Sequence, residues 1–173
     1  YLYDFFYDNC ATKIKDVLIE ALDEPLSFNS PNAFSPKTFR KLIHDHVNKN
    51  SWGSLGIDVA LGSVIDKEAT EEEHMFLPTY IHVFFGNATF SNSGEALVKN
   101  SKVLFEKIDK PVSKSFLTSP LLLFGAISLI IILITYFDYK KSKRSKVLDL
   151  VLFTLTGLIG IFVLLLWFAT DHT

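Results

Sequence analysis

The sequence lacks most of the short patterns by which metal, redox and nucleotide sites are recognised. It contains one cysteine, so no disulfide can form within the chain. It has neither a C-x-x-C nor an H-E-x-x-H pattern, and its glycines do not follow the G-x-G-x-x-G spacing of a dinucleotide loop. We therefore expect no metal ion and no other cofactor in the chemistry of this chain.

A surplus of positive charge is also missing. Lys and Arg number 17 against 19 Asp and Glu, for a formal net charge of −2, and this balance argues against a nucleic-acid partner. The sequence has no initiator methionine and no signal-peptide pattern, and it stops just after an apolar run. We expect it to be a piece of a longer protein.

What the chain does contain is an excess of apolar residues at its C-terminal end. Residues 117–137 and 150–169 are runs of 21 and 20 residues without a charged side chain. With a rise of about 1.5 Å per residue, a helix of either length can cross a hydrocarbon core of about 30 Å. We predict two transmembrane helices here, with the buried hairpin of a soluble protein as the alternative.

The segment between these runs, residues 138–149, is basic. Its five positive side chains are Lys140, Lys141, Lys143, Arg144 and Lys146. By the positive-inside rule such a short loop is cytoplasmic. Residues 1–116 and 170–173 are then both predicted to lie on the opposite side of the membrane.

The only cysteine, Cys10, lies at a predicted helix start. Asp8 and Asn9 are favourable N-caps, and apolar residues recur at helical spacing from Ile14 to Leu22. Because Cys10 precedes Ile14 by four positions, we predict that it projects from the same inward face. A helix N-terminus favours a thiolate and offers N–H groups to an oxyanion. Cys10 is therefore a candidate nucleophile, with a small buried hydrophobic residue as the alternative.

The remainder of residues 1–110 is predicted to be mostly helical. The expected helices start at Ser35-Pro36, lie within residues 52–66, follow Thr70 and cover residues 80–90. Phe39, Leu42 and Ile43 give the first of these an apolar face. Thr70 and Glu73 have the spacing of a capping box. Residues 111–116 are predicted to be a linker to the first span.

A nucleophilic thiol needs a base, and the chain has five histidines. We predict surface positions for His44 and His82, a core position for His46 and a solvated one for His74. His172, next to Asp171, follows the second span and is predicted to be on the same side of the membrane as Cys10. Titratable groups at a membrane boundary are often functional, which makes His172 a candidate base, with a plain polar flank as the alternative.

Several blocks of this sequence resemble the Lnb-type lipoprotein N-acyltransferases of Bacteroidetes. The stretch Asp8-Asn9-Cys10-Ala11-Thr12-Lys13-Ile14-Lys15-Asp16 is similar to that family's NC-x-T-(K/R)-x-(K/R)-D signature. Further similar blocks are Leu61-Gly62, Asp66-Lys67, Met75-Phe76-Leu77-Pro78, Leu148-Asp149, Gly157-Leu158-Ile159-Gly160, Leu166-Trp167-Phe168 and Thr170-Asp171-His172.

The resemblance implies a mainly α membrane protein of the bacterial inner membrane. Its periplasmic thiol domain, here the helical part over residues 1–110, would be related to permuted NlpC-type, papain-like (α+β) folds. The resemblance implies catalytic roles for Cys10 and for a histidine, which is either His172 or lies upstream of residue 1. Asn9, Thr12 and Asp171 would have supporting roles.

The implied reaction moves a fatty acyl group through a Cys10 thioester onto the α-amino group of a diacylglyceryl-cysteine lipoprotein. The implied partners are a phospholipid acyl donor, a diacylated lipoprotein acceptor and membrane lipid. Two alternatives stay open. One is a membrane-anchored NlpC-type cysteine peptidase or amidase acting on cell-wall peptide, and the other is a non-enzymatic membrane scaffold.

Overall fold

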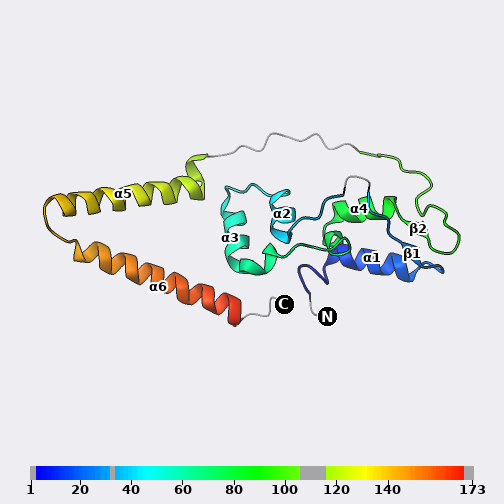
Figure 1. Ribbon diagram of the computed structural model, residues 1–173, viewed down its shortest axis with the longest axis horizontal. Coiled ribbons are helices and arrows are strands. Elements are labelled where there is room, and N and C mark those ends of the chain that lie inside the picture. Colours follow the sequence, from blue (N-terminus) through cyan, green and yellow to red (C-terminus); the bar gives the residue numbers. More distant parts are fainter. Residues whose placement is uncertain (1–2, 32–33, 106–115, 170–173) are drawn as a thin grey trace. The chain divides into compact units, whose positions relative to one another are not determined.

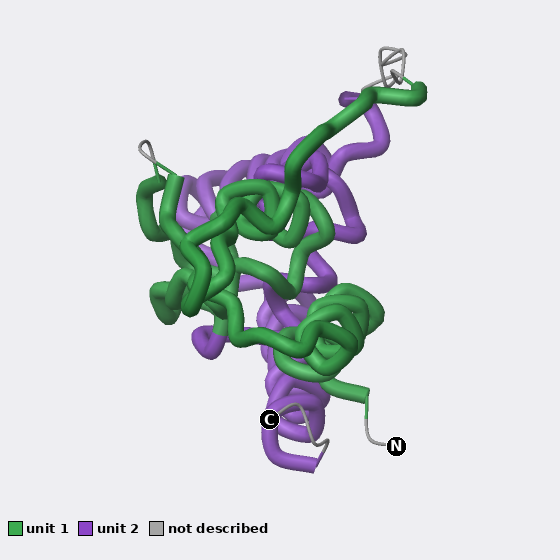
Figure 2. The backbone as a smooth tube through the Cα atoms, turned by 90° about the vertical axis from the view of Figure 1, so that its right-hand side faces the viewer, with its two compact units in different colours: residues 1–42, 65–110, 173 green, residues 43–64, 111–172 purple. Residues whose placement is uncertain are grey.

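The computed structural model describes residues 3–31, 34–105 and 116–169, and its chain divides into two compact units (Figures 1 and 2). The first, which we call the thiol unit, comprises residues 1–42, 65–110 and 173. The second, the membrane unit, comprises residues 43–64 and 111–172. A segment from the middle of the predicted soluble domain therefore belongs with the C-terminal helices.

The thiol unit is built from short elements. In chain order they are α1 (Cys10–Glu20), β1 (Leu26–Ser27), the start of α2 (Phe39–His44), the 3₁₀ helix η2 (Glu73–Phe76), α4 (Pro78–Gly86) and β2 (Thr89–Phe90). The two strands pair antiparallel, with Leu26 opposite Phe90. This hairpin-like pair joins the segments that follow α1 and α4.

Aromatic side chains form the core of the thiol unit. Met75, Phe84 and Phe85 are buried, and six partly buried side chains pack on them: Leu26, Phe28, Phe34, Tyr80, Ile81 and Leu97. A second group joins the N-terminal segment to η2 and α2. There the ring centroid of Phe6 lies 4.6 Å from that of Phe39 and 5.3 Å from that of Phe76. Such offset and edge contacts add to the stabilisation from apolar burial.

The predicted helices of this unit exist, but their bounds differ from expectation. The helix expected from Ser35-Pro36 begins only at Phe39, because Thr38 forms an antiparallel bridge with Glu68. In this bridge Phe39 N donates to the Lys67 carbonyl at 3.2 Å and Ala69 N donates to the Lys37 carbonyl at 3.0 Å. The helix expected over residues 80–90 is α4, which ends at Gly86, so that Thr89 and Phe90 are free to pair with β1.

The membrane unit contains α3 (Trp52–Leu61), the 3₁₀ helix η1 (Gly62–Asp66, which leads into the thiol unit), the 3₁₀ helix η3 (Phe116–Thr118), α5 (Pro120–Lys140) and α6 (Lys146–Phe168). Helices α5 and α6 have mean hydropathies of 2.5 and 2.6 over their most apolar windows, and almost none of their side chains is buried. Each is long and apolar enough to cross a bilayer. Together they make this a mainly α-helical membrane protein.

Serine side chains cap the N-terminal starts of both membrane helices. Helix α5 starts at Pro120, after the Ser119 side chain that accepts from Leu122 N, whereas the uncharged run begins at residue 117. Helix α6 starts at Lys146, four residues before its uncharged run, because the Ser145 side chain caps it by accepting from Leu148 N. Side-chain caps, rather than the last charged residue, decide where these helices begin.

Candidate functional site

The start of α1 is held by a reciprocal cap around Asn9. The Asn9 Oδ1 atom accepts from Ala11 N at 2.7 Å and from Thr12 N at 3.0 Å, and Asn9 N donates to Thr12 Oγ1 at 2.8 Å. Asn9 was one of the two residues that we predicted as the cap, and Thr12 completes the motif as a capping box. Both residues are buried, with exposed fractions of 7%.

The amide nitrogen of Asn9 also fixes this helix start to the rest of the unit. Asn9 Nδ2 donates to the carbonyl oxygens of Phe5, at 2.9 Å, and Phe76, at 3.0 Å. One side chain therefore joins the N-terminal segment, α1 and the end of η2. The position of Cys10, the next residue, follows from these five hydrogen bonds.

Cys10 is exposed on the first turn of α1. The alternative that it is a buried hydrophobic residue is therefore wrong. The cap uses the N–H groups of Ala11 and Thr12, so they are not available to an oxyanion. Among the described residues, neither the Cys10 thiol nor the Cys10 backbone N–H has a hydrogen-bond partner. The backbone N–H of Cys10 itself is thus the donor of the first turn that can meet an incoming carbonyl oxygen.

The apolar face of α1 points outward, which corrects the sequence prediction. Ile14, Val17 and Leu18 are 57%, 62% and 43% exposed, and Cys10 shares their side of the helix. The buried residues of α1 are instead Ala11 and Thr12, at its start. Helical periodicity identifies an apolar face but does not reveal whether the described chain covers it. Around the thiol this face forms an apolar surface.

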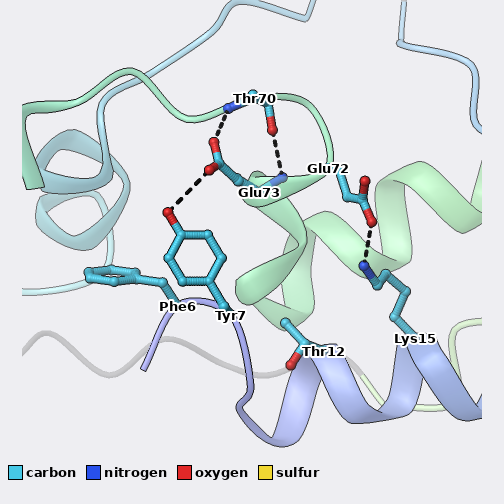
Figure 3. Close-up of a pocket in the computed structure, with 7 residues that line it drawn as sticks. All are labelled: Phe6, Tyr7, Thr12, Lys15, Thr70, Glu72 and Glu73. Atoms are coloured by element: carbon cyan, nitrogen blue, oxygen red, sulfur yellow. Dashed lines mark hydrogen bonds and ion pairs between the residues drawn. The ribbon is translucent and has the colours of Figure 1, made fainter. Parts of the chain in front are cut away.

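The opposite side of α1 borders a polar cavity of about 360 Å³ (Figure 3). Its lining residues are Phe6, Tyr7, Thr12, Lys15, Thr70, Glu72 and Glu73. Lys15, whose side chain is 12% exposed, reaches across to Glu72, with Nζ 2.7 Å from Oε1. Cys10 is not among the lining residues, so the cavity and the thiol lie on different sides of α1.

Glu73 is the electrostatic centre of this cavity. Its carboxylate accepts from Thr70 N at 2.7 Å, Lys67 Nζ at 2.9 Å and Tyr7 Oη at 3.2 Å. Partial desolvation raises the pKa of Glu73, but the hydrogen bonds from Thr70, Lys67 and Tyr7 outweigh it and lower the pKa from 4.5 to about 2. Desolvation and the nearby Glu73 carboxylate raise the pKa of Tyr7. The network is therefore built around a charged Glu73 and a neutral Tyr7.

The two reciprocal hydrogen bonds of the predicted Thr70–Glu73 capping box are present, since Glu73 N also donates to Thr70 Oγ1 at 3.2 Å. Thr70 is not the N-cap of a helix as predicted, because the segment that follows is the short 3₁₀ helix η2, which begins at Glu73 and has Glu72 as its N-cap. The cavity itself was not predicted from the sequence. Lys15 belongs to the signature stretch, which was the available signal, but Tyr7 and Glu73 come together only through the fold.

The histidines occupy different environments from those expected. His74 is fully buried, not solvated, with Nδ1 2.6 Å from the Thr70 carbonyl oxygen and with the rings of Phe34 and Tyr80 beside it. His46 is exposed rather than in the core, and His82 is exposed as predicted. His44 is half-buried in the membrane unit, where its Nε2 atom lies 3.0 Å from Asp58 Oδ2.

The predicted base lies outside the part of the chain that the structure describes. His172 and Asp171 both fall in the undescribed residues 170–173, so no distance relates either to Cys10. No group of three His, Cys, Asp or Glu side chains within the described ranges could hold a metal ion.

The basic loop between α5 and α6 is a tight turn ordered by Asp138. The Asp138 carbonyl oxygen accepts from Lys143 N at 2.9 Å, and its Oδ2 atom accepts from Ser145 N at 2.7 Å. Ser142 adopts a left-handed conformation with φ of 49°. Only residues 141–145 separate α5 from α6, so if both helices cross a bilayer, the start of α5 and the end of α6 lie on the same side of it.

A comparison with protein families gives a match in the C-terminal part of this chain. The model described as the Lnb transmembrane domain matches residues 112–173, which include both α5 and α6. No curated protein and no solved structure matches the chain. The family match supports an Lnb-type membrane protein, and it covers the membrane helices rather than the segment that carries Cys10.

Proposed function

We propose that this chain carries the nucleophile of a lipoprotein N-acyltransferase, with Cys10 as the acyl carrier. The observation that carries the proposal is the exposed thiol on a rigidly capped helix start, in a chain whose membrane helices match the Lnb transmembrane domain. The Asn9 cap holds the thiol in one position, and the free Cys10 N–H is a donor for the developing oxyanion.

The reaction takes place in two steps. In the first, the Cys10 thiolate attacks the ester carbonyl of a phospholipid acyl chain. A carbon–sulfur bond forms, the ester carbon–oxygen bond breaks, and the lysophospholipid leaves as an alcohol after it takes up a proton. In the second, the α-amino group of a diacylated lipoprotein attacks the thioester. The amide bond forms, the acyl carbon–sulfur bond breaks, the amine gives up a proton, and the Cys10 thiolate takes up a proton to regenerate the thiol.

The proposal includes a histidine that takes the thiol proton and returns a proton to the leaving alcohol. Two positions fit this role in the proposal. One is His172, which follows α6 and is aided by Asp171, and the other is a histidine upstream of residue 1. The enzyme would be placed in the bacterial inner membrane with the thiol unit in the periplasm, where mature lipoprotein N-termini are exposed.

The surroundings of Cys10 favour an acyl substrate over a cell-wall peptide. Ile14, Leu18 and Phe5, which are 57%, 43% and 46% exposed, provide apolar area on the segments that flank the thiol. A fatty acyl chain gains about 0.8 kcal/mol for each methylene group that such a surface removes from water. A peptidase needs hydrogen-bonding side chains along its groove instead, whereas the residues four, seven and eight positions after Cys10 (Ile14, Val17 and Leu18) are all apolar.

The test is the detection of the acyl intermediate on Cys10. We expect intact-protein mass spectrometry of the purified whole protein, incubated with phospholipid vesicles without an acceptor, to show the added mass of one fatty acyl group. Hydroxylamine should remove it, as expected for a thioester. Cys10→Ser should abolish both the hydroxylamine-labile adduct and lipoprotein N-acylation in cells.

A matched control moves the thiol elsewhere. Ser30 lies in an exposed loop, so Cys10→Ser combined with Ser30→Cys presents an accessible thiol without a helix cap. We expect no adduct on this double variant. Full N-acylation by Cys10→Ser, or an equal adduct on the relocated thiol of the control, would disprove the proposed role of Cys10.

A further inference from the structure

The segment of residues 43–64 lies in the middle of the predicted soluble domain, yet it packs with the membrane helices. Its helix α3 contacts α6 within the membrane unit. At the end of α3, the indole Nε1 of Trp167 donates to the Val59 carbonyl oxygen at 3.0 Å. The same ring covers Gly62, where a Cβ atom would lie only 2.7 Å from Trp167 Cζ2.

The beginning of α3 is bound to the start of α5 in a similar way. The indole Nε1 of Trp52 donates to the Thr118 carbonyl oxygen at 2.8 Å, and the Trp52 ring lies 5.9 Å from that of Phe124. Leu121 N donates to Asn50 Oδ1 at 3.2 Å. The two tryptophans of the sequence thus fix the two ends of α3 to the start of α5 and the end of α6.

The outward face of α3 is apolar and uncharged. Trp52, Gly56 and Val59 are exposed and lie at positions i, i+4 and i+7, so they share one face. The only charged residue of α3, Asp58, is half-buried and pairs with His44. A helix with such an exposed surface leaves unfavourable apolar area in contact with water unless another phase covers it.

We propose that α3 lies in the headgroup–acyl boundary of the bilayer leaflet that contains the start of α5 and the end of α6. Hydrogen bonds connect the two ends of α3 to the start of α5 and to the end of α6. Tryptophan prefers this boundary, because its ring is apolar while its N–H finds an acceptor. The covering phase is therefore phospholipid rather than a protein partner.

This assignment does not depend on acyl transfer. It adds residues 52–61 to the membrane-contacting part of the chain, beyond the two spans. The chain runs from both ends of residues 43–64 into the thiol unit, so these two connections add to the one before α5.

The two tryptophans allow a direct test in phospholipid vesicles. Trp167→Phe leaves Trp52 as the single tryptophan, and Trp52→Phe leaves Trp167. Bromine atoms on lipid chains quench tryptophan emission at short range. We expect bromines placed near the ester groups to quench Trp52 about twofold more than bromines near the chain ends, with little quenching by aqueous iodide. Trp167 serves as the internal reference for the end of a span.

A charge on the outward face gives a further test. Val59→Asp, in the Trp167→Phe background, should reduce bromolipid quenching of Trp52 and increase quenching by iodide. Val103→Asp is the matched control, because Val103 is also an exposed valine but belongs to the thiol unit. It should leave both values unchanged.

A second measurement keeps both tryptophans and their hydrogen bonds. No atom lies within 4 Å of a Cβ placed on Gly56, so Gly56→Cys in a Cys10→Ser background can carry a nitroxide label. We expect its electron paramagnetic resonance relaxation to respond more to oxygen, which concentrates in lipid, than to a water-soluble nickel chelate. Strong iodide quenching of Trp52 without bromolipid quenching, together with a nickel-dominated response at residue 56, would overturn the assignment.

Discussion

Asn9 determines the position of the candidate nucleophile through five hydrogen bonds of two kinds. Its Oδ1 atom and its backbone N–H form the helix cap, while its Nδ2 atom donates to the carbonyl oxygens of Phe5 and Phe76. A cap determines where a helix begins, whereas the Nδ2 bonds determine where this helix start sits against η2. The two contributions can be separated by substitution, because aspartate keeps an acceptor and lacks the donor.

We predict that Asn9→Ala lowers the free energy of opening of α1 by about 2–3 kcal/mol, since it removes the cap and leaves two carbonyl oxygens without their donor. Asn9→Asp should restore only part of this loss. Hydrogen exchange of the α1 amides, followed by mass spectrometry, measures both changes. Asn87→Ala, which removes an exposed Asn-to-carbonyl bond at 2.8 Å, is the control. Native protection in Asn9→Asp would show that the Nδ2 bonds contribute nothing.

Glu73 gives the thiol unit a pH dependence with a defined sign. Its pKa is lowered from 4.5 to about 2 in the folded chain, so the folded state binds this proton less readily than the unfolded state. The stabilisation is therefore complete above the unfolded pKa and is lost as the pH falls toward the folded pKa. Solvent screening at this partly open cavity limits the effect to about 1 kcal/mol.

We expect the protection of the η2 amides against hydrogen exchange, corrected for the intrinsic rate, to decrease between about pH 5 and pH 2. Glu73→Gln should flatten this part of the profile. Glu71→Gln, at an exposed neighbouring position, is the control and should leave the slope intact. An unchanged slope in Glu73→Gln would exclude the Tyr7–Lys67–Thr70 network as the source of the pH dependence.

The hydrogen bonds of single residues were predictable from the sequence where both partners lie close together in the chain. The Asn9 cap and the Thr70–Glu73 pair depend on residues three positions apart, and both were predicted. The burial of His74 was not, because its covering rings come from Phe34 and Tyr80, and the three glutamates before it indicated solvent. The apolar face of α1 was wrongly predicted to point inward for a related reason. Helical periodicity identifies an apolar face but does not specify which other segment, if any, packs against it.

At the scale of elements, the contact between α3 and α6 depends on one glycine. Gly62 has φ of 60° and ψ of −138°, a conformation that side chains with a Cβ rarely adopt, and Trp167 occupies the space where a Cβ would be. Both effects oppose any larger residue. Gly56, in the same segment, has neither constraint.

We predict that Gly62→Ala destabilises the membrane unit by about 1–3 kcal/mol, whereas Gly56→Ala is neutral or stabilises it by up to about 1 kcal/mol through helix propensity. Both tryptophans belong to the membrane unit, so their near-ultraviolet circular dichroism bands report on this unit alone. The midpoint of their thermal loss should fall in Gly62→Ala only. Equal midpoints in the two variants would mean that the Trp167–Gly62 contact does not stabilise the unit.

Elements were predictable from the sequence in proportion to their length and uniformity. The two uncharged runs and the α1 pattern each produced a helix close to its predicted place. The grouping of α3 with the membrane helices was not predictable, because it depends on indole bonds that join residues 66 and 108 positions apart. The cavity around Glu73 depends on contacts of the same long-range kind.

At the scale of the whole molecule, the function depends on which side of the membrane each part occupies. If α5 and α6 both cross the bilayer, the loop around Ser142 and the start of α5 lie on opposite sides of it. The five basic residues near Ser142 favour a cytoplasmic position for the loop. The exposed Cys10 would then be on the side where lipoproteins receive their third acyl chain.

The single native cysteine makes this orientation measurable. We expect a membrane-impermeant maleimide to label Cys10 in intact spheroplasts, because the thiol is exposed. In a Cys10→Ser background, Ser142→Cys places an exposed thiol in the basic loop, and its labelling should require permeabilised membranes. Replacing Lys140, Lys141 and Lys143 with glutamine in this variant removes three of the positive charges that favour a cytoplasmic loop. A fraction of the Ser142→Cys thiols should then be labelled in intact spheroplasts. Labelling of Ser142→Cys in intact spheroplasts, with Cys10 protected, would place the thiol in the cytoplasm and remove the basis for acyl transfer to exported lipoproteins.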